Sequence, residues 1–411
     1  MKRLSCWLLN HYFYLMGLFG LGSMLNLFLL YKSSLLIFIP SLFLFFNYVL
    51  CKKLGNIDKL VIATMLYIII VGIFNSYNFE YFYFGVRYVV GTMVFFFVGR
   101  SSLMIGDRFF INMLTPLIII YIFALILFLY PPSWYLMWKT QNLNELVHEN
   151  SVWEMLRLSG FWIYPYFISY SACLFSLFFI KKIVCNGQAN VSKNWSAILF
   201  SILLLVLAGQ RVALFYSLLC LGIGLFCILK RSVISKRNKI YIISFIVIII
   251  GVLPLILVQY VSEDQLSFLM DRIASKNTDE NIVVERFTMF SEFLDKDILL
   301  FGDGVGRYSH IANSDGNMAI TDCQYLLILY ENGIIGLAMF GLIFLFAIYT
   351  ALKKWHYYIY ELSVIIFYLI AFLGANALGS QEMHSAIFWI CIGRVFNKEA
   401  LEYKRVTKNY L

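Results

Sequence analysis

The sequence predicts an all-α integral membrane protein that crosses the bilayer about twelve times. Hydrophobic residues make up 61% of its 411 residues and charged residues only 13%, so the apolar surplus must face lipid rather than fill one soluble core. The apolar residues also collect in stretches of helix length. Lysines and arginines recur between those stretches, where cytoplasmic loops are expected.

Twelve apolar stretches are candidate spans, and the seventh and the last are short for the roughly 20 residues that a helical span needs. In chain order they cover residues 8–31, 34–51, 60–79, 81–99, 109–130, 161–180, 195–209, 212–229, 240–260, 332–352, 359–378 and 384–397. The first follows the basic start Met1-Lys2-Arg3. It is predicted to be a retained helix, because it is long for a signal peptide and lacks a clear small-residue cleavage site.

The basic residues support an even number of spans with both termini in the cytoplasm. With the N-terminus inside, the inner segments hold Lys52, Lys53, Lys59, Arg100, Arg108, Lys181, Lys182, Lys193, Lys230, Arg231, Lys236, Arg237, Lys239, Lys353, Lys354, Lys398, Lys404, Arg405 and Lys408. The same alternation sends two long loops, 131–160 and 261–321, to the exterior. We predict one membrane domain, residues 1–411, because no transporter-like repeat relates its halves.

Several other classes of protein are disfavoured. The net charge of +9 comes from basic residues scattered over short loops, so membrane topology explains it better than nucleic-acid binding. The basic run from Lys230 to Lys239 fits attraction to anionic lipid of the inner leaflet. Most of the eight cysteines lie in apolar runs or beside the inner lysines, which argues against a disulfide framework. No Cys-His spacing indicates a metal site, and no cofactor is predicted.

The first exterior loop, 131–160, opens with two prolines and carries several tryptophans, including Trp134 and Trp138. Tryptophans at this level act either as interfacial anchors or as a platform for stacking sugars. The acidic residues of the loop have partly helical spacing, and a solvated loop helix accounts for them.

The candidate chemistry lies where the large exterior loop, 261–321, meets a span. Asp322, Tyr325 and Glu331 all belong to this boundary, Asp322 as a candidate catalytic residue and Tyr325 and Glu331 as candidate substrate contacts. Glu331 follows Asp322 by nine positions, which on one unbroken helix places them on opposite faces, about 13 Å apart along the axis. Asp322 either caps the helix start or contacts substrate, and Glu331 makes a structural contact unless Gly333 breaks the helix.

Five arginines are candidate contacts for an anionic substrate. Arg211 follows Gly209 at an exterior turn between two spans, where a planar guanidinium can hold a diphosphate with two parallel hydrogen bonds or form a structural ion pair. Arg286 has the same two interpretations, with Glu285 or Glu292 as its ion-pair partner. Arg87 lies inside a span, where it is either functional or extends to the outer face as a structural residue. Arg157 and Arg307 are weaker candidates of the same type.

A glycine-rich run, Phe301 to Arg307, precedes the boundary. It lacks the strand-turn-helix context of a dinucleotide site, so it is interpreted as a flexible turn or as backbone amides offered to a phosphate or sugar. His310 in the large loop and His384 at the mouth of the last span are each either a base with a pKa near neutrality or a solvated residue.

Taken together, these motifs resemble the O-antigen polymerase and ligase superfamily, in which a His-Asn or similar pair precedes Gly-x-x-Gly by nine residues. Gly333 and Gly336 fit the glycines, and Asp322-Cys323 stands where the ligases have His-Asn. Ala208-Gly209-Gln210-Arg211, Arg286 and Phe301-Gly302-Asp303-Gly304 are similar to further family motifs. The resemblance covers roughly residues 199–341.

The resemblance implies a polymerase that joins undecaprenyl-diphosphate-linked repeat units at the periplasmic face of a bacterial inner membrane. Arg211 and Arg286 would hold the diphosphate, and Asp322 would orient or deprotonate the acceptor hydroxyl. A chain-length regulator is left open as a partner. Two alternatives stay open: an O-antigen ligase, disfavoured by Asp322 in place of histidine, and a polytopic polysaccharide or solute transporter.

Overall fold

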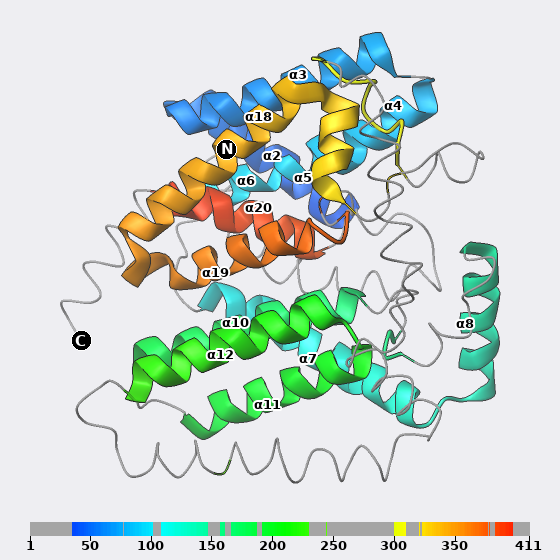
Figure 1. Ribbon diagram of the computed structural model, residues 1–411, viewed down its shortest axis with the longest axis vertical. Coiled ribbons are helices and arrows are strands. Elements are labelled where there is room, and N and C mark those ends of the chain that lie inside the picture. The colour runs from blue at the N-terminus through cyan, green and yellow to red at the C-terminus, as the bar shows by residue number, and fades with distance from the viewer. Residues whose placement is uncertain are drawn as a thin grey trace. The chain divides into compact units, whose positions relative to one another are not determined.

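A computed structural model describes residues 35–76, 78–101, 108–146, 157–160, 166–186, 191–229, 244, 300–309, 320, 323–376, 378 and 383–397. All regular elements in these ranges are helices (Figure 1). They are α2 (Leu35–Cys51), α3 (Asn56–Asn75), α4 (Phe79–Gly85), the π-helix η1 (Val86–Val90), α5 (Gly91–Met93), α6 (Phe95–Ser101), α7 (Arg108–Leu129), α8 (Ser133–Leu146), α10 (Tyr166–Asn186), α11 (Val191–Ala208), α12 (Arg211–Leu229), α18 (Gln324–Lys353), α19 (Trp355–Ala371) and α20 (Met383–Val395).

The helices agree with an integral membrane protein. Among the described residues, four helical segments are long and apolar enough to cross a membrane: 56–75, 79–101, 166–185 and 324–353. A fifth is added if α7 and α8, which bend by 97° at their junction, form one broken span. Ten of the twelve predicted spans overlap a described helix, and 8–31 and 240–260 lie outside the described residues apart from residue 244. The total of twelve stays a prediction.

The outward face of α3 illustrates how such a helix suits lipid. Leu66, Ile70, Ile73 and Phe74 are between 53% and 82% exposed, so a continuous apolar surface lies on the outside of a well-packed helix. A soluble protein rarely exposes such a face, whereas hydrocarbon chains cover it without cost.

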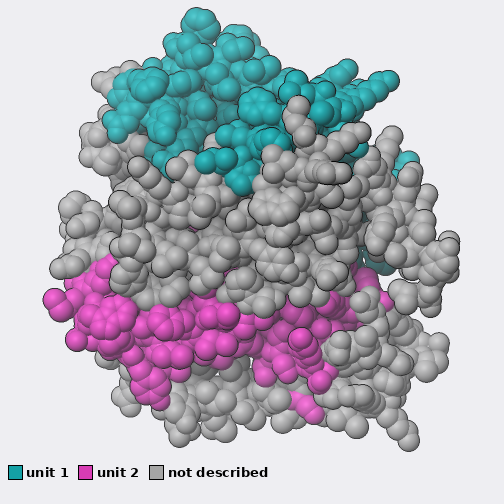
Figure 2. Space-filling model, turned by 180° about the vertical axis from the view of Figure 1, so that it is seen from behind, with its two compact units in different colours: residues 1–22, 30–113, 287–411 teal, residues 23–29, 114–286 magenta. Residues whose placement is uncertain are grey.

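The chain divides into two compact units (Figure 2): unit 1 contains residues 1–22, 30–113 and 287–411, and unit 2 contains residues 23–29 and 114–286. The prediction of a single membrane domain stays a prediction. In unit 1, α20 packs against α6, α2 also packs against α6, and α18 packs against α3 and α19. In unit 2, α10 packs against both α11 and α12.

Two glycines allow α6 and α20 to pack with their backbones in close contact. A Cβ atom at Gly99 would lie 2.2 Å from the carbonyl oxygen of Ile390, and one at Gly393 would lie 2.0 Å from that of Phe96. Small residues of this kind let helices approach closely inside a membrane, where packing rather than exclusion of water drives association.

Replacing Gly393 with alanine is therefore expected to lower the thermal unfolding midpoint of the purified protein, because the added methyl group pushes α20 away from α6. Gly341→Ala is the matched control, since nothing lies within 4 Å of a Cβ atom there. Unfolding in detergent, followed by intrinsic fluorescence, measures both variants. Equal midpoints for Gly393→Ala and wild type would contradict the close packing.

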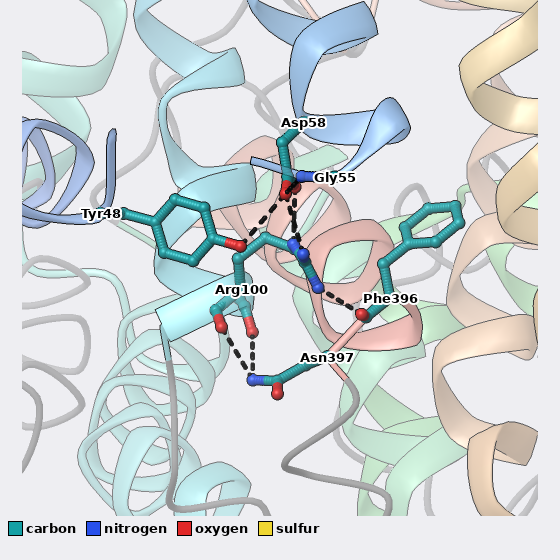
Figure 3. A network of polar contacts seen from close by, with 7 residues as sticks. Tyr48, Gly55, Asp58, Arg100, Phe396 and Asn397 are labelled. Carbon is teal, nitrogen blue, oxygen red and sulfur yellow. Dashed lines mark hydrogen bonds and ion pairs between the residues drawn. The ribbon is translucent and has the colours of Figure 1, made fainter. Parts of the chain in front are cut away.

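One end of unit 1 is fastened by a buried ion pair (Figure 3). Arg100 holds Asp58 with two hydrogen bonds, from Nε to Oδ1 at 2.6 Å and from Nη2 to Oδ2 at 2.9 Å. Tyr48 and the backbone N–H of Gly55 also donate to Oδ2 of Asp58, at 3.1 and 2.9 Å. Because Asp58 is fully buried and the Arg100 side chain only 12% exposed, the pair is shielded from solvent.

The same network reaches the end of α20. Arg100 donates through Nη1 to the carbonyl of Phe396, and Asn397 Nδ2 donates to the carbonyls of Gly99 and Arg100, at 3.3 and 2.9 Å. A second ion pair, between Arg394 Nη2 and Glu361 Oε1 at 2.9 Å, joins α20 to α19. The charge pattern assigns all of these residues to the cytoplasmic ends of their spans. Their meeting in one network is what the predicted alternation requires within unit 1.

In unit 2, the loop predicted to begin at residue 131 instead continues as the helix α8. Tyr135 and Trp138 of α8 pack on Leu127 of α7. The hydroxyl of Tyr135 donates to the carbonyl of Gly160 at 2.6 Å. The sharp bend between α7 and α8 follows from Pro131 and Pro132, which remove backbone donors and cannot continue a helix.

Candidate functional site

The glycine loop, residues 300–309, is clamped between helices of unit 1. Gly302, Gly304 and Gly306 all have positive φ, at 78°, 99° and 89°. A Cβ atom at Gly302 would lie 2.4 Å from the backbone nitrogen of Gly333, and one at Gly306 would lie 2.0 Å from the carbonyl oxygen of Tyr81. Glycine is therefore needed here both for its conformation and for close packing. The chain turns sharply at these glycines, as predicted, and it does so packed against the backbone of neighbouring segments.

The glycine loop lies against a break in α18. Gly333 has φ 68° and ψ −173°, which interrupts the helix and frees backbone groups on both sides. The loop occupies these groups: Asp303 N–H donates to the carbonyl of Tyr330 at 2.8 Å, and Gly304 N–H to that of Glu331 at 3.0 Å. The break considered at Gly333 is thus present. It follows Glu331, so Gln324 to Glu331 form one unbroken stretch of helix.

Two further bonds complete the closure of the break. Tyr67 of α3 donates its hydroxyl to the carbonyl of Asn332 at 2.8 Å, and the N–H of Ile335 donates to the carbonyl of Leu300 at 3.3 Å. Broken helices that bind ions or substrates leave such groups open to the ligand. In α18 these groups bind the protein's own chain instead.

Glu331, predicted as a substrate contact or a structural residue, has its carboxyl group turned into the protein. It is 2% exposed, and Oε1 accepts the backbone N–H of Tyr308 at 3.2 Å. The amides of residues 303, 304 and 308 are thus bound to groups of α18. The hypothesis that these three amides meet a phosphate or sugar is therefore wrong.

The carboxylate of the glycine loop that does face outward belongs to Asp303, which sequence reasoning did not select. It is partly exposed, and its Oδ2 accepts a short hydrogen bond from the hydroxyl of Tyr308. The Tyr308 ring packs against Tyr330, Leu327 and Ile320. Sequence offers one signal for this pair, an aspartate between two glycines with a tyrosine five residues later.

Tyr325 is a predicted substrate contact. Its hydroxyl instead makes a structural hydrogen bond, which it donates to the carbonyl of Leu369 at 2.8 Å. Its neighbour Gln324 donates its N–H to the carbonyl of Phe372 at 3.0 Å and accepts the N–H of Leu378 at 2.9 Å. The first turn of α18 is therefore bound to the end of α19. Cys323 is the N-cap residue and makes no side-chain cap bond.

A second group of site residues lies in unit 2. The basic cluster, defined as Lys139, Arg157 and Arg211, surrounds the turn between α11 and α12. Arg157 donates from Nε to the carbonyl of Ala208, the last residue of α11, at 2.9 Å. Lys139 donates from Nζ to the carbonyl of Arg157 at 3.2 Å. Arg211 is the first residue of α12, two residues after Gly209, whose φ of 63° makes the tight turn that the sequence predicted.

Two cations of the basic cluster are buried, which is unusual for lysine and arginine. Lys139 and Arg157 are 3% and 2% exposed, and Arg211 is partly exposed. Buried cations near a membrane are costly and usually serve a function. The N-terminus of α12, where Arg211 lies, adds its own partial positive charge. The arrangement suits a multiply charged anion. The sequence did not single out Lys139, because this residue lies in the predicted loop 131–160.

The remaining candidates divide into those described and those not. Arg87 lies in the π-helix η1, partly exposed, with its guanidinium 5.9 Å from the Tyr88 ring centroid. Arg307 is exposed at the outer side of the glycine loop. Asp322, Arg286 and His310 lie outside the described residues, as does the side chain of His384. Within the described ranges, no group of three or more His, Cys, Asp or Glu residues could hold a metal ion.

Comparisons with protein-family models, with curated proteins and with solved structures each found no match to this chain.

Proposed function

We propose that this protein is a surface-polysaccharide polymerase of the O-antigen type, which joins undecaprenyl-diphosphate-linked oligosaccharide repeat units at the periplasmic face of the inner membrane. The observation that carries the proposal is the basic cluster, where Arg157 is bound to the end of α11, Lys139 is bound to Arg157, and Arg211 begins α12 after the turn. The cluster lies at the ends of two predicted spans, where the headgroup of a membrane lipid can reach it. A lipid-linked diphosphate is a multiply charged anion found at that level. The resemblance at Gly333, Gly336 and Arg211 supplies the substrate class.

In the proposed reaction, a hydroxyl oxygen of the acceptor repeat attacks the anomeric carbon of the donor chain. The bond from that carbon to the diphosphate oxygen breaks, and the lipid diphosphate leaves with the electron pair. Arg211, with Arg286, would stabilise the charge that develops on the leaving group. Displacement in one step predicts inversion at the anomeric carbon. Asp322 keeps its predicted role at the acceptor hydroxyl.

The closed break in α18 supports an enzyme over a transporter. In a transporter of the broken-helix type, the freed backbone groups near the break coordinate the cargo. Here the carbonyls of Tyr330, Glu331 and Asn332 already accept hydrogen bonds from residues 303 and 304 and from Tyr67. The proposed substrate contacts lie instead at predicted exterior ends of helices.

Deleting the gene in its host is expected to leave lipid A-core with a single repeat and no ladder of longer chains. Wild type should restore the ladder at matched protein level, and Arg211→Ala should not, because the diphosphate loses its fixed charged partner. Arg211→Lys should restore it only in part, since a lysine keeps the charge but not the planar pair of donors. Surface-polysaccharide gels of the four strains measure the outcome.

Lys193→Ala is the matched control, since this exposed residue lies at the opposite end of α11 from the turn. It should restore the ladder fully. If the null strain loses even the single repeat, the protein is a ligase or moves the repeat across the membrane, and the polymerase proposal is withdrawn.

A further inference from the structure

The first half of α8 orients its side chains in the opposite way to a helix in water. Trp134, Leu136 and Met137 are 47%, 41% and 64% exposed. Lys139 is the only charged residue from 131 to 140, yet it is 3% exposed and lies one helical turn after Tyr135, which packs on α7. A helix in water exposes its charges and buries its large apolar side chains. The reversed pattern indicates that something apolar covers the outward face.

The outward face of this half-helix has little polarity of its own. Helical spacing places only two small polar residues, Ser133 and Thr140, beside Met137. The hydroxyl of Thr140 already donates to the carbonyl of Leu136 at 2.8 Å. After Thr140 the sequence becomes mostly polar, from Gln141 to Glu145, which marks the end of the apolar stretch.

The same face continues the outward apolar surface of α7. On that helix Ile119, Ile122, Phe123 and Ile126 are between 39% and 64% exposed, and Tyr130, just after its end, is 69% exposed. The chain then bends by 97° into α8 (Figure 1). A helix at a right angle to a span lies in the plane of the membrane, at the level where the span ends. Tyrosine and tryptophan are enriched at that level.

We propose that α8 is a membrane-surface helix, which inserts Trp134, Leu136 and Met137 between the headgroups and acyl chains of the leaflet in which α7 ends. The ligand of this face is the lipid bilayer itself. Interfacial helices bind in this way, with the apolar face toward the acyl chains. The other interpretation of the tryptophans, a platform for sugars, relies on aromatic rings, and two of the three exposed side chains have none.

The position of α8 also fixes the height of the basic cluster. Lys139, on the inward face, donates to the carbonyl of Arg157 at 3.2 Å, and Arg157 donates to the last carbonyl of α11. Tyr135 fastens the same helix to Gly160. A helix α8 at the lipid surface therefore keeps these cations at the level of the headgroups. This holds whether or not the protein polymerises a repeat unit.

Spin labels on full-length protein in nanodiscs of phosphatidylethanolamine and phosphatidylglycerol test this position. Single cysteines are introduced into a variant whose eight native cysteines are alanine: Met137→Cys on the outward face of α8, Ile122→Cys on α7, and Lys53→Cys as the exposed control. Oxygen, which enters lipid, and a water-soluble nickel complex report the surroundings of each label by collision. The label at 137 should collide mainly with oxygen, less deeply than the label at 122, and the label at 53 mainly with nickel.

Nickel collisions as frequent at 137 as at 53 would show a solvated helix and overturn the proposal. Few collisions with either reagent would show that protein covers the face, either another segment or a second copy, and would overturn it as well. If the variant without native cysteines does not fold, lipids brominated near the headgroup serve with the native cysteines in place. Trp134→Phe should then remove part of the tryptophan fluorescence that these lipids quench, and an unchanged quenched fraction would contradict insertion.

Discussion

Replacing Glu331 with alanine is expected to release the glycine loop from α18 and to abolish polymer formation. The carboxyl group accepts the backbone N–H of Tyr308 inside the protein. Its removal takes away the acceptor of a buried donor, at a cost of about 1–3 kcal/mol, and adds a cavity. The glycine loop then loses one of its attachments at the break in α18, so residues 303–308 should become more open to solvent than in wild type.

Glu331→Gln distinguishes the acceptor from the charge. Glutamine keeps a carbonyl oxygen in the same place, so the loop should stay bound and most of the ladder should remain. Protection of the amides of residues 303–308 from hydrogen exchange, measured by mass spectrometry on the purified variants, reports the state of the loop directly. Wild-type protection in Glu331→Ala would show that the loop is held by other contacts.

The second large effect is expected at the buried ion pair of unit 1. Arg100→Met leaves Asp58, which is fully buried, without its cation, and breaking a buried pair in this way costs about 3–5 kcal/mol. Asp58→Asn likewise leaves Arg100 without its anionic partner. In the double variant both charges are gone, so its stability should be higher than the sum of the two single losses predicts.

Thermal unfolding in detergent of the two single variants and the double variant gives this coupling. Lys53→Met is the control, because Lys53 is an exposed cation on the same predicted side. It should unfold at the wild-type temperature. Additive losses from Arg100→Met and Asp58→Asn would contradict a direct, shielded ion pair.

Much of the fold could be predicted from composition and apolar periodicity. The predicted span 34–51 corresponds to α2 at Leu35–Cys51, and 212–229 corresponds to α12 at Arg211–Leu229. These boundaries are sharp because polar or turn-forming residues end each apolar run. The rule that places basic residues inside grouped Lys59, Arg100 and Lys398 at one end. Asp58 and Asn397, each next to one of these lysines in the sequence, meet Arg100 in the network of Figure 3.

Two elements could not be predicted from hydropathy. The span expected at 332–352 belongs to a helix that begins eight residues earlier, at Gln324, because Gln324, Tyr325 and Glu331 are polar yet satisfied by contacts with α19 and the glycine loop. The helix α8 replaces part of a predicted loop, because Tyr135 and Trp138 pack on α7. Tertiary contacts decide both cases, and hydropathy alone does not reveal them.

The candidate site was predictable only in part. Arg211 and the turn at Gly209 follow from local sequence, since a positive φ favours glycine. Lys139 and Asp303 do not, because their importance depends on neighbours distant along the chain, Arg157 and Tyr330 among them. Glycine-rich runs are commonly flexible, and here three such glycines instead fit a tightly packed contact with a broken helix.

Reconstitution tests the central claim most directly. Purified wild-type protein in liposomes is mixed with the undecaprenyl-diphosphate-linked repeat unit extracted from the null strain, and the products are separated by gel and mass spectrometry. The proposal predicts lipid-linked chains of two and more repeats, with release of undecaprenyl diphosphate, and no such products from Arg211→Ala. Liposomes that carry the repeat unit from one leaflet to the other without elongating it would contradict the proposal and favour a transporter.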